Sequence, residues 1–336
     1  MKISVIVPVY NEGESVRVAY DRISHVFTDQ LSQHGYEIIF VDDGSADDSF
    51  FHLSTLAAAH SHVRVIKFAQ NAGSHMAIRA GLEHATGDAA VFLACDLQDP
   101  PEMIPKMLDA LQPPVRIVWA VRDTRHDSFS SKVGSRAFFA LARMLVSKNL
   151  PPSGASMFLL GPDALRAVPL HRERNLTLEG LFATMGLAQA QVPYDRRDRK
   201  FGKSKWTLGK KLKLFADFFV GYSYAPIRLM SYVGMSVAAL GFVYVIILLI
   251  NKLRIGTPVE GWTSLMVVLL IVGGVQMTML GIIGEYVWRG LDETRRRPRY
   301  IVEQFLNAPT SRPGLEIDQT ELTIFEFERR KVSNEN

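Results

Sequence analysis

The chain has 336 residues, enough for one domain of ordinary size and an additional region, and its single cysteine, Cys95, excludes an internal disulfide. The net charge is +4, but residues 196–213 alone hold nine Lys or Arg and one acid. Such a basic segment can bind nucleic acid or anionic lipid headgroups, and the apolar segments that follow it favour lipid and argue against nucleic acid. The composition therefore indicates a protein of a reducing compartment that works at a membrane.

The first 125 residues alternate between strand-like and helix-like patterns. Strands are expected at 3–9, 37–42, 63–68, 89–95 and 116–120, and helices at 14–31, 47–60, 76–85 and 102–111. Strands separated by helices of this length predict βαβ crossovers, so we expect an α/β, Rossmann-like fold with a mainly parallel sheet covered on both faces. The chain starts directly with a strand pattern and shows no signal peptide, so we expect its bulk to stay where it is made.

Later elements are separated by turns rich in proline and glycine. We expect a helix at 130–146, a strand at 157–160, and a further helix and strand at 175–185 and 188–192. Segment 207–222 mixes lysines with leucines and phenylalanines, which is typical of a helix in the membrane interface. A surface helix packed on the domain is the alternative.

Two segments, 229–250 and 263–284, each contain 22 residues without a charged side chain. Each would form a helix of about 33 Å, enough to cross a bilayer, whereas a buried helix of a soluble core is the alternative. The short connection predicts a hairpin. Several arginines follow it and place both its ends in the cytoplasm, although Lys252 and Arg254 lie in the connection. These arginines are Arg289, Arg295, Arg296, Arg297 and Arg299.

Four regions are therefore expected in the chain. They are a cytoplasmic α/β domain at 1–205, an interfacial helical region at 206–227, two transmembrane helices within 228–288, and a cytoplasmic tail at 289–336. The protein would be a multi-pass protein of the inner (plasma) membrane with both termini in the cytoplasm. The apolar sides of the hairpin would face lipid or a second copy of the chain, which leaves a homo-oligomer open.

Polar side chains follow four of the predicted strands, at the ends where ligands of open α/β sheets bind. Small residues precede the helix after the third strand and permit an anion to approach the helix start closely. The polar or small residues are, strand by strand, Pro8, Tyr10 and Glu12; Asp42 and Asp43; Asn71 and Gly73; and Asp96, Gln98 and Asp99.

Each strand end also has an ordinary structural explanation. Ser45 and Asp48 form a capping-box pattern. The turn at Asp96 fits an Asx turn before a helix that begins at Pro101. All four ends fall on one edge of the predicted sheet, however, and this coincidence favours a ligand site. Several carboxylates beside a helix start suit a diphosphate with a divalent cation such as Mg²⁺, which takes few protein oxygens.

Several motifs together resemble those of family 2 GT-A glycosyltransferases. They are V-P-V-Y-N-E from Val7, V-D-D-G-S from Val41, N-A-G from Asn71, D-L-Q-D-P-P-E from Asp96, R-K-F-G-K-S-K-W from Arg199, two apolar spans, and R-P-R-Y from Arg297. More narrowly, the chain is similar to the membrane branch that makes polyprenyl-phosphate sugars, such as dolichyl-phosphate mannose synthase and undecaprenyl-phosphate glucosyltransferases. The resemblance extends over residues 3–301.

The resemblance implies a nucleotide-sugar site at these strand ends, in which Pro8, Tyr10, Glu12 and Asp43 hold the base and ribose. With the strand-end argument, the expected nucleotide-binding residues are Pro8, Tyr10, Glu12, Asp42, Asp43, Asn71, Gly73 and Asp96.

The resemblance also implies that Asp96 and Gln98 bind Mg²⁺ or Mn²⁺ that bridges the diphosphate. The family often has D-x-D-x-Q here, but Ala94 takes the first position, so Asp42, Asp43 or Asp99 would have to compensate. Asp99 is otherwise expected to cap the next helix or to support the ligands. Relatives often carry an acid within 153–158, where this chain offers only Ser153 and Ser156.

A lipid phosphate acceptor is already ionised near neutral pH, so its attack on a sugar needs alignment and a cation rather than a strong base. Basic and hydroxyl residues are therefore expected to contact the acceptor and product phosphates, although a solvated loop or simple positive-inside topology would also explain the basic residues. These residues are Arg122, Arg125, Lys132, Ser135, Arg136, Arg199, Ser204 and Lys205. The expected catalytic set is Asp96, Arg122, Lys132, Arg199 and Lys205.

The sequence thus predicts an inverting, metal-dependent transfer of one sugar from a UDP- or GDP-sugar to a polyprenyl phosphate, with undecaprenyl phosphate favoured. Two alternatives stay open. One is a glycosyltransferase that acts on a hydroxyl group of another lipid or of a polysaccharide. The other is a non-catalytic membrane adaptor of the same fold.

Overall fold

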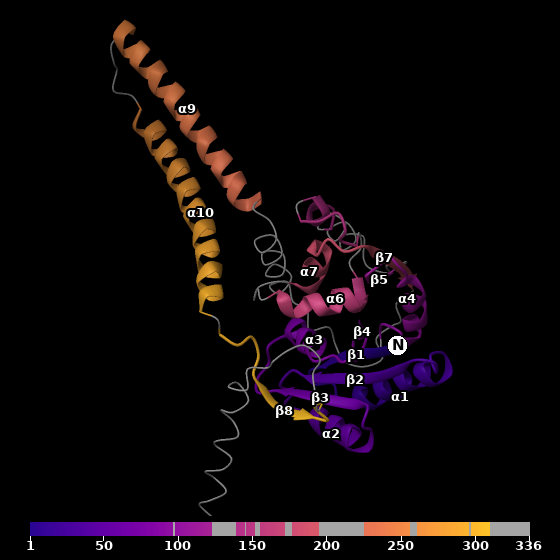
Figure 1. The fold of residues 1–336 in the computed structure, drawn as a ribbon. Coiled ribbons are helices and arrows are strands. Elements are labelled where there is room, and N and C mark those ends of the chain that lie inside the picture. Colours follow the sequence, from indigo (N-terminus) through magenta and orange to yellow (C-terminus); the bar gives the residue numbers. More distant parts are fainter. Residues whose placement is uncertain are drawn as a thin grey trace, which may run out of the picture.

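The computed structural model describes residues 1–96, 98–122, 139–144, 146–151, 155–171, 177–194, 225–255, 261–295 and 297–309. Their centre is an eight-stranded sheet in the order β7-β5-β6-β4-β1-β2-β3-β8 (Figure 1). β6 and β8 run antiparallel to their neighbours and the other pairs are parallel, which confirms the expected mainly parallel α/β sheet. The strands are β1 (Lys2–Val9), β2 (Gly35–Asp42), β3 (Val63–Phe68), β4 (Ala89–Phe92), β5 (Ile117–Arg122), β6 (Ala155–Leu160), β7 (Gln189–Tyr194) and β8 (Val302–Leu306).

Helices cover both faces of the sheet because successive strand side chains point to opposite sides. Val5 and Val7 of β1 belong to the core under α1, whereas Ile6 belongs to the core under α3. Gly81 allows α3 to pack closely, since a Cβ there would lie 2.3 Å from Ile6 Cγ2. One face carries α1 (Gly13–Asp29), α2 (Ser49–Ala59), η1 (Pro101–Met103) and α4 (Ile104–Ala110); the other carries α3 (Ser74–Glu83), α6 (Pro162–Ala167), η2 (Val168–Leu170) and α7 (Leu178–Thr184).

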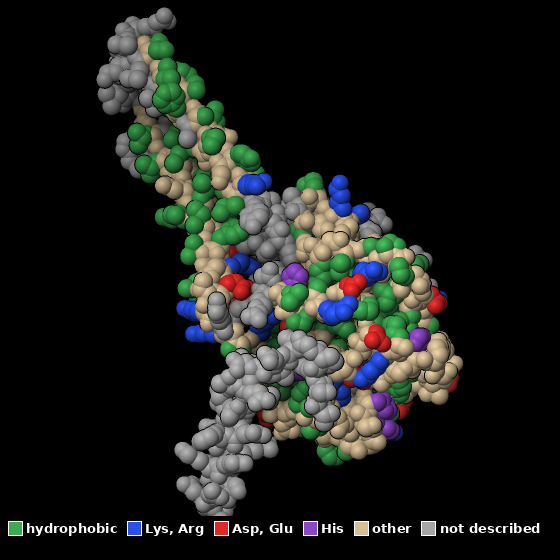
Figure 2. All heavy atoms as spheres, viewed as in Figure 1, with side chains coloured by type: hydrophobic (Ala, Val, Ile, Leu, Met, Phe, Trp, Pro, Cys, Tyr) green, Lys and Arg blue, Asp and Glu red, His purple; other side chains and the backbone are tan. Residues whose placement is uncertain are grey.

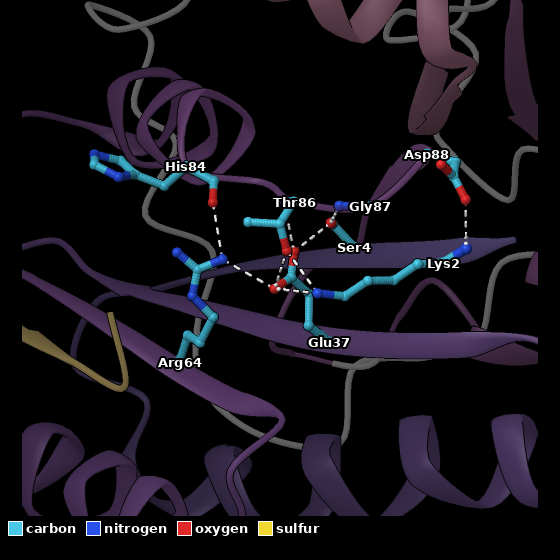
Figure 3. A network of polar contacts seen from close by, with 8 residues as sticks. All are labelled: Lys2, Ser4, Glu37, Arg64, His84, Thr86, Gly87 and Asp88. Carbon is cyan, nitrogen blue, oxygen red and sulfur yellow. Dashed lines mark hydrogen bonds and ion pairs between the residues drawn. The ribbon is translucent and has the colours of Figure 1, made fainter. Parts of the chain in front are cut away.

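A polar network lies at the amino ends of the central strands (Figure 3). Glu37 of β2 is 3% exposed and accepts hydrogen bonds from Ser4 Oγ at 2.6 Å and from Arg64 Nη1 at 2.9 Å. Lys2 Nζ lies 3.3 Å from the same carboxylate, and the Thr86 backbone N–H donates to it at 2.7 Å. This carboxylate is therefore fully compensated inside the protein and holds β1, β2 and β3 together.

Two long helices, α9 (Ala225–Ile255) and α10 (Trp262–Thr294), lie side by side and project from the domain (Figure 1). They contain the two predicted spans. By length and composition, windows at Ile227–Tyr244 and Ile271–Thr294 can cross a membrane, and neither window is buried inside the protein. Figure 2 shows apolar side chains along this hairpin, with basic side chains where it approaches the domain.

β8 was not predicted, because residues 302–306 were assigned to the C-terminal tail. The strand pairs antiparallel with β3 and so returns the chain to the sheet after the hairpin. Just before it, Tyr300 stacks on Phe68 with ring centroids 4.7 Å apart and donates a hydrogen bond to Glu83 Oε2 at 2.7 Å. The segment after α10 is thereby fixed to both β3 and α3.

Most predicted elements are confirmed with small shifts at their ends. The strand expected at 89–95 ends earlier, at Phe92, and the polar turn begins sooner than predicted. The helix expected at 175–185 corresponds to the shorter α7. The interfacial segment 207–222 and most of the expected helix 130–146 lie outside the described residues.

Candidate active site

The strand ends that the sequence singled out do lie on one edge of the sheet. β1, β2, β3 and β4 are parallel, and β5 and β7 share their direction because β6 runs antiparallel to both β4 and β5. Their carboxyl ends therefore meet at the same edge, where β6 begins. We call this the carboxyl edge.

The loops after β1 and β2 are joined by hydrogen bonds. Asn11, with a φ of 52°, donates its backbone N–H to Ser45 Oγ at 3.0 Å, and its Oδ1 accepts from the Ala46 N–H at 2.8 Å. Ser49 Oγ accepts from the Glu12 N–H at 2.9 Å. The predicted capping box is therefore wrong. α2 begins at Ser49, and its N-cap residue Asp48 makes no side-chain capping bond. The Ser45 hydroxyl instead accepts a hydrogen bond from the Asn11 N–H.

Asp43, directly after β2, holds the loop before α3. Its Oδ1 accepts from the Ala72 N–H at 2.6 Å, and its Oδ2 accepts from the Gly73 N–H at 3.0 Å and from Asn71 Nδ2 at 2.9 Å. Gly44 has a φ of +69°, and a Cβ there would lie 2.8 Å from the Asn71 backbone N. Only glycine allows the two loops to approach this closely.

Two adjacent carboxylates therefore lie buried at the end of β2. Asp42 is fully buried and Asp43 is 3% exposed. Asp42 Oδ1 accepts from the Ser45 N–H at 3.0 Å, while its buried Oδ2 has no hydrogen-bond partner in the described structure. Burial raises the pKa of Asp43, and the neighbouring Asp42 adds to this, against hydrogen bonds from Ala72 and Gly73 that lower it. A cation bound near Asp42 and Asp43 would stabilise their ionised forms.

The ends of β1 and β4 also meet. Cys95 is buried, and burial raises the pKa of its thiol well above the usual value, with Glu12, which forms a hydrogen bond with it, and Asp96 adding to the effect. Glu12 and Asp96 therefore both lie close to Cys95. Asp96 Oδ1 accepts from the Gln98 N–H at 3.1 Å, which is the Asx turn considered from the sequence, and it keeps Asp96 and Gln98 in one turn.

A second group of polar residues lies at the ends of β5, β6 and β7. Arg122, the last residue of β5, donates from Nε to Ser156 Oγ of β6 at 2.8 Å. Tyr194, the last residue of β7, donates its hydroxyl proton to Asp99 Oδ1. Asp99 and Tyr194 are 2% and 5% exposed, so this contact is buried under the carboxyl edge.

Comparison with known proteins identifies the family. Residues 4–166 match the model described as glycosyl transferase family 2, and residues 225–289 match the model described as GtrB C-terminal hairpin. The chain is 35% identical to an uncharacterized glycosyltransferase, YkcC, of Bacillus subtilis over 302 residues, which cover 90% of this chain and 93% of that one. It is 33% identical to a bactoprenol glucosyl transferase of Shigella phage SfX over 304 residues, covering 90% and 99%.

The chain belongs to glycosyltransferase family 2. Its sheet is of the GT-A type, and the matched hairpin corresponds to α9 and α10. Among solved structures, the mannosyltransferase PcManGT from Pyrobaculum calidifontis, in complex with GDP-Man and Mn²⁺, has a TM-score of 0.43 and 15% identity, covering 88% of each chain. The family membership shows that the chain is an enzyme.

In this glycosyltransferase the carboxyl edge brings together the predicted nucleotide residues of three strand ends. Tyr10, Asp43 and Asn71 belong to neighbouring loops, and Tyr10 is 37% exposed beside them. Asn71 and Gly73 hydrogen-bond to Asp43, so their direct role with a nucleotide stays a prediction. The remaining residues predicted to contact phosphates, apart from Arg122, lie outside the described residues: Arg125, Lys132, Ser135, Arg136, Arg199, Ser204 and Lys205.

The described residues fit a divalent cation that takes few protein ligands. No group of three His, Cys, Asp or Glu side chains that could hold a metal occurs in the described part of the glycosyltransferase. Asp96 and Gln98 instead offer oxygen ligands from one partly exposed turn, which suits Mg²⁺ or Mn²⁺ completed by phosphates and water. Because Ala94 takes the first position, buried Asp99 is the one carboxylate of the turn 94–99 besides Asp96.

Sequence reasoning did not identify Tyr194 as part of this site. The predicted strand ended at 192, two residues too early, and so Tyr194 was not placed at the carboxyl edge. The observation that would have found it is a buried tyrosine at the end of a strand parallel to β5. Of the two roles expected for Asp99, capping of the next helix is not seen, because the N-cap of η1 is Pro100, and support of the ligands stays a prediction.

Proposed function

We propose that this enzyme transfers a single sugar from a UDP- or GDP-sugar to a polyprenyl phosphate, most simply undecaprenyl phosphate, at the cytoplasmic face of the inner membrane. The observation that carries the proposal is the similarity to a bactoprenol glucosyl transferase over 90% of this chain, including the hairpin. The exposed apolar helices α9 and α10 support it, because they would hold the domain next to a lipid substrate.

The chemistry follows from the acceptor. An oxygen of the lipid phosphate attacks the anomeric carbon, the bond from that carbon to the nucleoside diphosphate breaks, and the diphosphate leaves with the bonding electrons. A direct in-line attack inverts the anomeric configuration. Because the acceptor oxygen is already ionised, the site has to align it rather than deprotonate it.

Residues of the carboxyl edge have separate roles in this proposal. Asp96 and Gln98 would hold Mg²⁺ or Mn²⁺, which when bound would supply positive charge to the leaving diphosphate. Tyr10, Glu12 and Asp43 would hold the base and ribose. Arg122 would bind acceptor or product phosphate as a cation, since no carboxylate pairs with it among the described residues and it donates to the neutral hydroxyl of Ser156.

The test is lipid extraction of reaction mixtures. Membranes that contain the protein are incubated with a labelled UDP- or GDP-sugar and undecaprenyl phosphate, and the organic phase is counted. Label that depends on Mg²⁺ or Mn²⁺ and on the phosphate acceptor supports the proposal. Label that appears with a hydroxyl acceptor and not with undecaprenyl phosphate would favour the alternative glycosyltransferase, and no label with any donor would refute transfer from a UDP- or GDP-sugar to undecaprenyl phosphate. NMR of the product that shows a retained configuration would refute inversion.

A further inference from the structure

A line of polar contacts runs from Arg122 to Asp99 at the carboxyl edge. Arg122 Nε donates to Ser156 Oγ at 2.8 Å. Ser156 also acts on the Tyr194 phenol and lowers its pKa, and the Tyr194 hydroxyl donates to Asp99 Oδ1. Two neutral hydroxyl groups thus separate a cation from a carboxylate; Ser156 accepts from Arg122 and Tyr194 donates to Asp99.

This direction is fixed by the chemistry of the two ends. A guanidinium can only donate, and an ionised carboxylate can only accept, so each hydroxyl between them has one consistent orientation. Burial, then Asp99, raises the pKa of Tyr194 to about 12, so its proton remains available for donation. Hydrogen bonds that follow one another in a buried site also polarise and strengthen each other.

The two ends of the line belong to different parts of the site. Asp99 directly follows Gln98, in the turn that Asp96 closes by accepting from the Gln98 N–H. Arg122 is the last residue of β5, and β6 lies between β5 and β4, the strand that precedes this turn. Tyr194 ends β7, which pairs with β5 on the side away from β6, and its hydroxyl nevertheless contacts Asp99 in the turn after β4.

We propose that Tyr194 is a positioning residue that couples the turn of Asp96 and Gln98 to Arg122 through Asp99 and Ser156. The inference deepens the proposed function and rests on it. Fixing Asp99 fixes the turn that would hold the cation on the donor diphosphate. The serine and tyrosine hydroxyls also keep Arg122 from pairing directly with Asp99, so its charge remains available to a phosphate.

The main test is Tyr194→Phe, which removes one hydroxyl and keeps the ring. Binding of UDP and of GDP is titrated calorimetrically with and without Mn²⁺, using the purified full-length protein. We expect the Mn²⁺-dependent part of the affinity to fall about tenfold, the effect typical of losing a group that orients a metal ligand. Tyr20→Phe is the matched control: Tyr20 is also buried, 7% exposed, but stacks on His60 away from the carboxyl edge, and should bind as wild type.

A second variant, Ser156→Ala, breaks the line on the Arg122 side and leaves the bond from Tyr194 to Asp99. It should raise the KM for undecaprenyl phosphate about tenfold while Mn²⁺-dependent nucleotide binding stays at the wild-type level. The split between the two variants distinguishes positioning from a general loss of packing, which would lower the melting temperature and affect both measurements alike.

The outcomes separate this inference from the proposed function. If wild type makes no lipid-linked product but binds nucleotide with Mn²⁺, and Tyr194→Phe weakens that binding, the proposed acceptor is wrong and the positioning role stands. If Tyr194→Phe lowers only the melting temperature and leaves Mn²⁺-dependent binding and the acceptor KM unchanged, the positioning role is refuted. A wild-type protein without Mn²⁺-dependent binding of either nucleotide would refute the metal site and the coupling with it.

Discussion

The two ends of strand β2 carry buried carboxylates with opposite electrostatics. At the amino end, burial opposes ionisation of Glu37, but hydrogen bonds from Ser4 and Thr86 together with Arg64 outweigh it and lower its pKa to about 2 (Figure 3). At the carboxyl end, burial and Asp42 raise the pKa of Asp43 in spite of its backbone hydrogen bonds. Both carboxylates are 3% exposed, so burial alone does not distinguish them.

What distinguishes them is the source of positive charge. Arg64 and Lys2 form ion pairs with Glu37, whereas no ion pair to Asp42 or Asp43 occurs in the described residues. A carboxylate that the protein itself compensates contributes to stability. A buried pair without a cation is suited to a ligand that brings one, and this is the physical reason to place the substrate at the carboxyl edge.

The largest expected effect is the loss of stability when the ion pair of Glu37 and Arg64 is broken. Arg64→Leu should lower the free energy of unfolding by about 3–5 kcal/mol, because it leaves the buried charge of Glu37 with only the partly exposed Lys2 as a cation. Thermal unfolding of the full-length protein in detergent measures the change. The double variant Glu37→Gln/Arg64→Leu removes both charges and should recover part of the loss; a double variant less stable than Arg64→Leu would contradict this account.

The next largest effect is on sugar transfer at the carboxyl edge. Asp96→Asn should reduce transfer about 100-fold or more, since the cation on the leaving diphosphate is worth several kcal/mol, and it should abolish stabilisation by Mn²⁺ with nucleotide. Its own melting temperature should stay near wild type, because the turn is partly exposed. Asp109→Asn, at an exposed position of α4, is the control and should retain full activity. Unchanged transfer by Asp96→Asn would refute the metal assignment.

The central fold was predictable from sequence because its signals are local. Apolar runs at 3–9 and 63–68 correspond closely to β1 and β3, and the uncharged segments 229–250 and 263–284 lie within α9 and α10. The carboxyl edge followed from the order of strands and helices, since parallel strands separated by helices bring their ends together.

Contacts between distant segments were not predictable in this way. Ser45 has a local capping pattern, but Asn11, 34 residues earlier, binds its hydroxyl. β8 has no local signal that it pairs with β3, more than 230 residues before it. Tyr194 likewise becomes a site residue only through Asp99, 95 positions away. These side-chain contacts depend on which strands become neighbours in the folded sheet, and a local sequence pattern does not carry that information.

A smaller effect concerns the pH dependence of stability. The folded-state pKa of Glu37, about 2, lies below its ordinary value of 4.5, so its contribution to stability is present above pH 4.5 and is lost as the pH falls toward 2. The stability difference between wild type and Glu37→Gln should therefore shrink by about 2 kcal/mol between pH 6 and pH 3. Melting temperatures of both proteins across this range measure it. A constant difference would show that ionised Glu37 is not stabilised by its network.

The smallest expected effect compares a glycine at each end of β2. Gly44→Ala should cost about 1–2 kcal/mol, because its φ of +69° disfavours a side chain and because its Cβ would lie 2.8 Å from the Asn71 backbone. Gly35→Ala is the matched control: a Cβ there meets nothing within 4 Å, so stability and nucleotide binding should remain near wild type. Gly44→Ala should also weaken binding of UDP or GDP, since it separates the Asp43 loop from the start of α3. Equal effects of the two substitutions on binding would mean that the carboxyl edge of β2 does not hold the nucleotide.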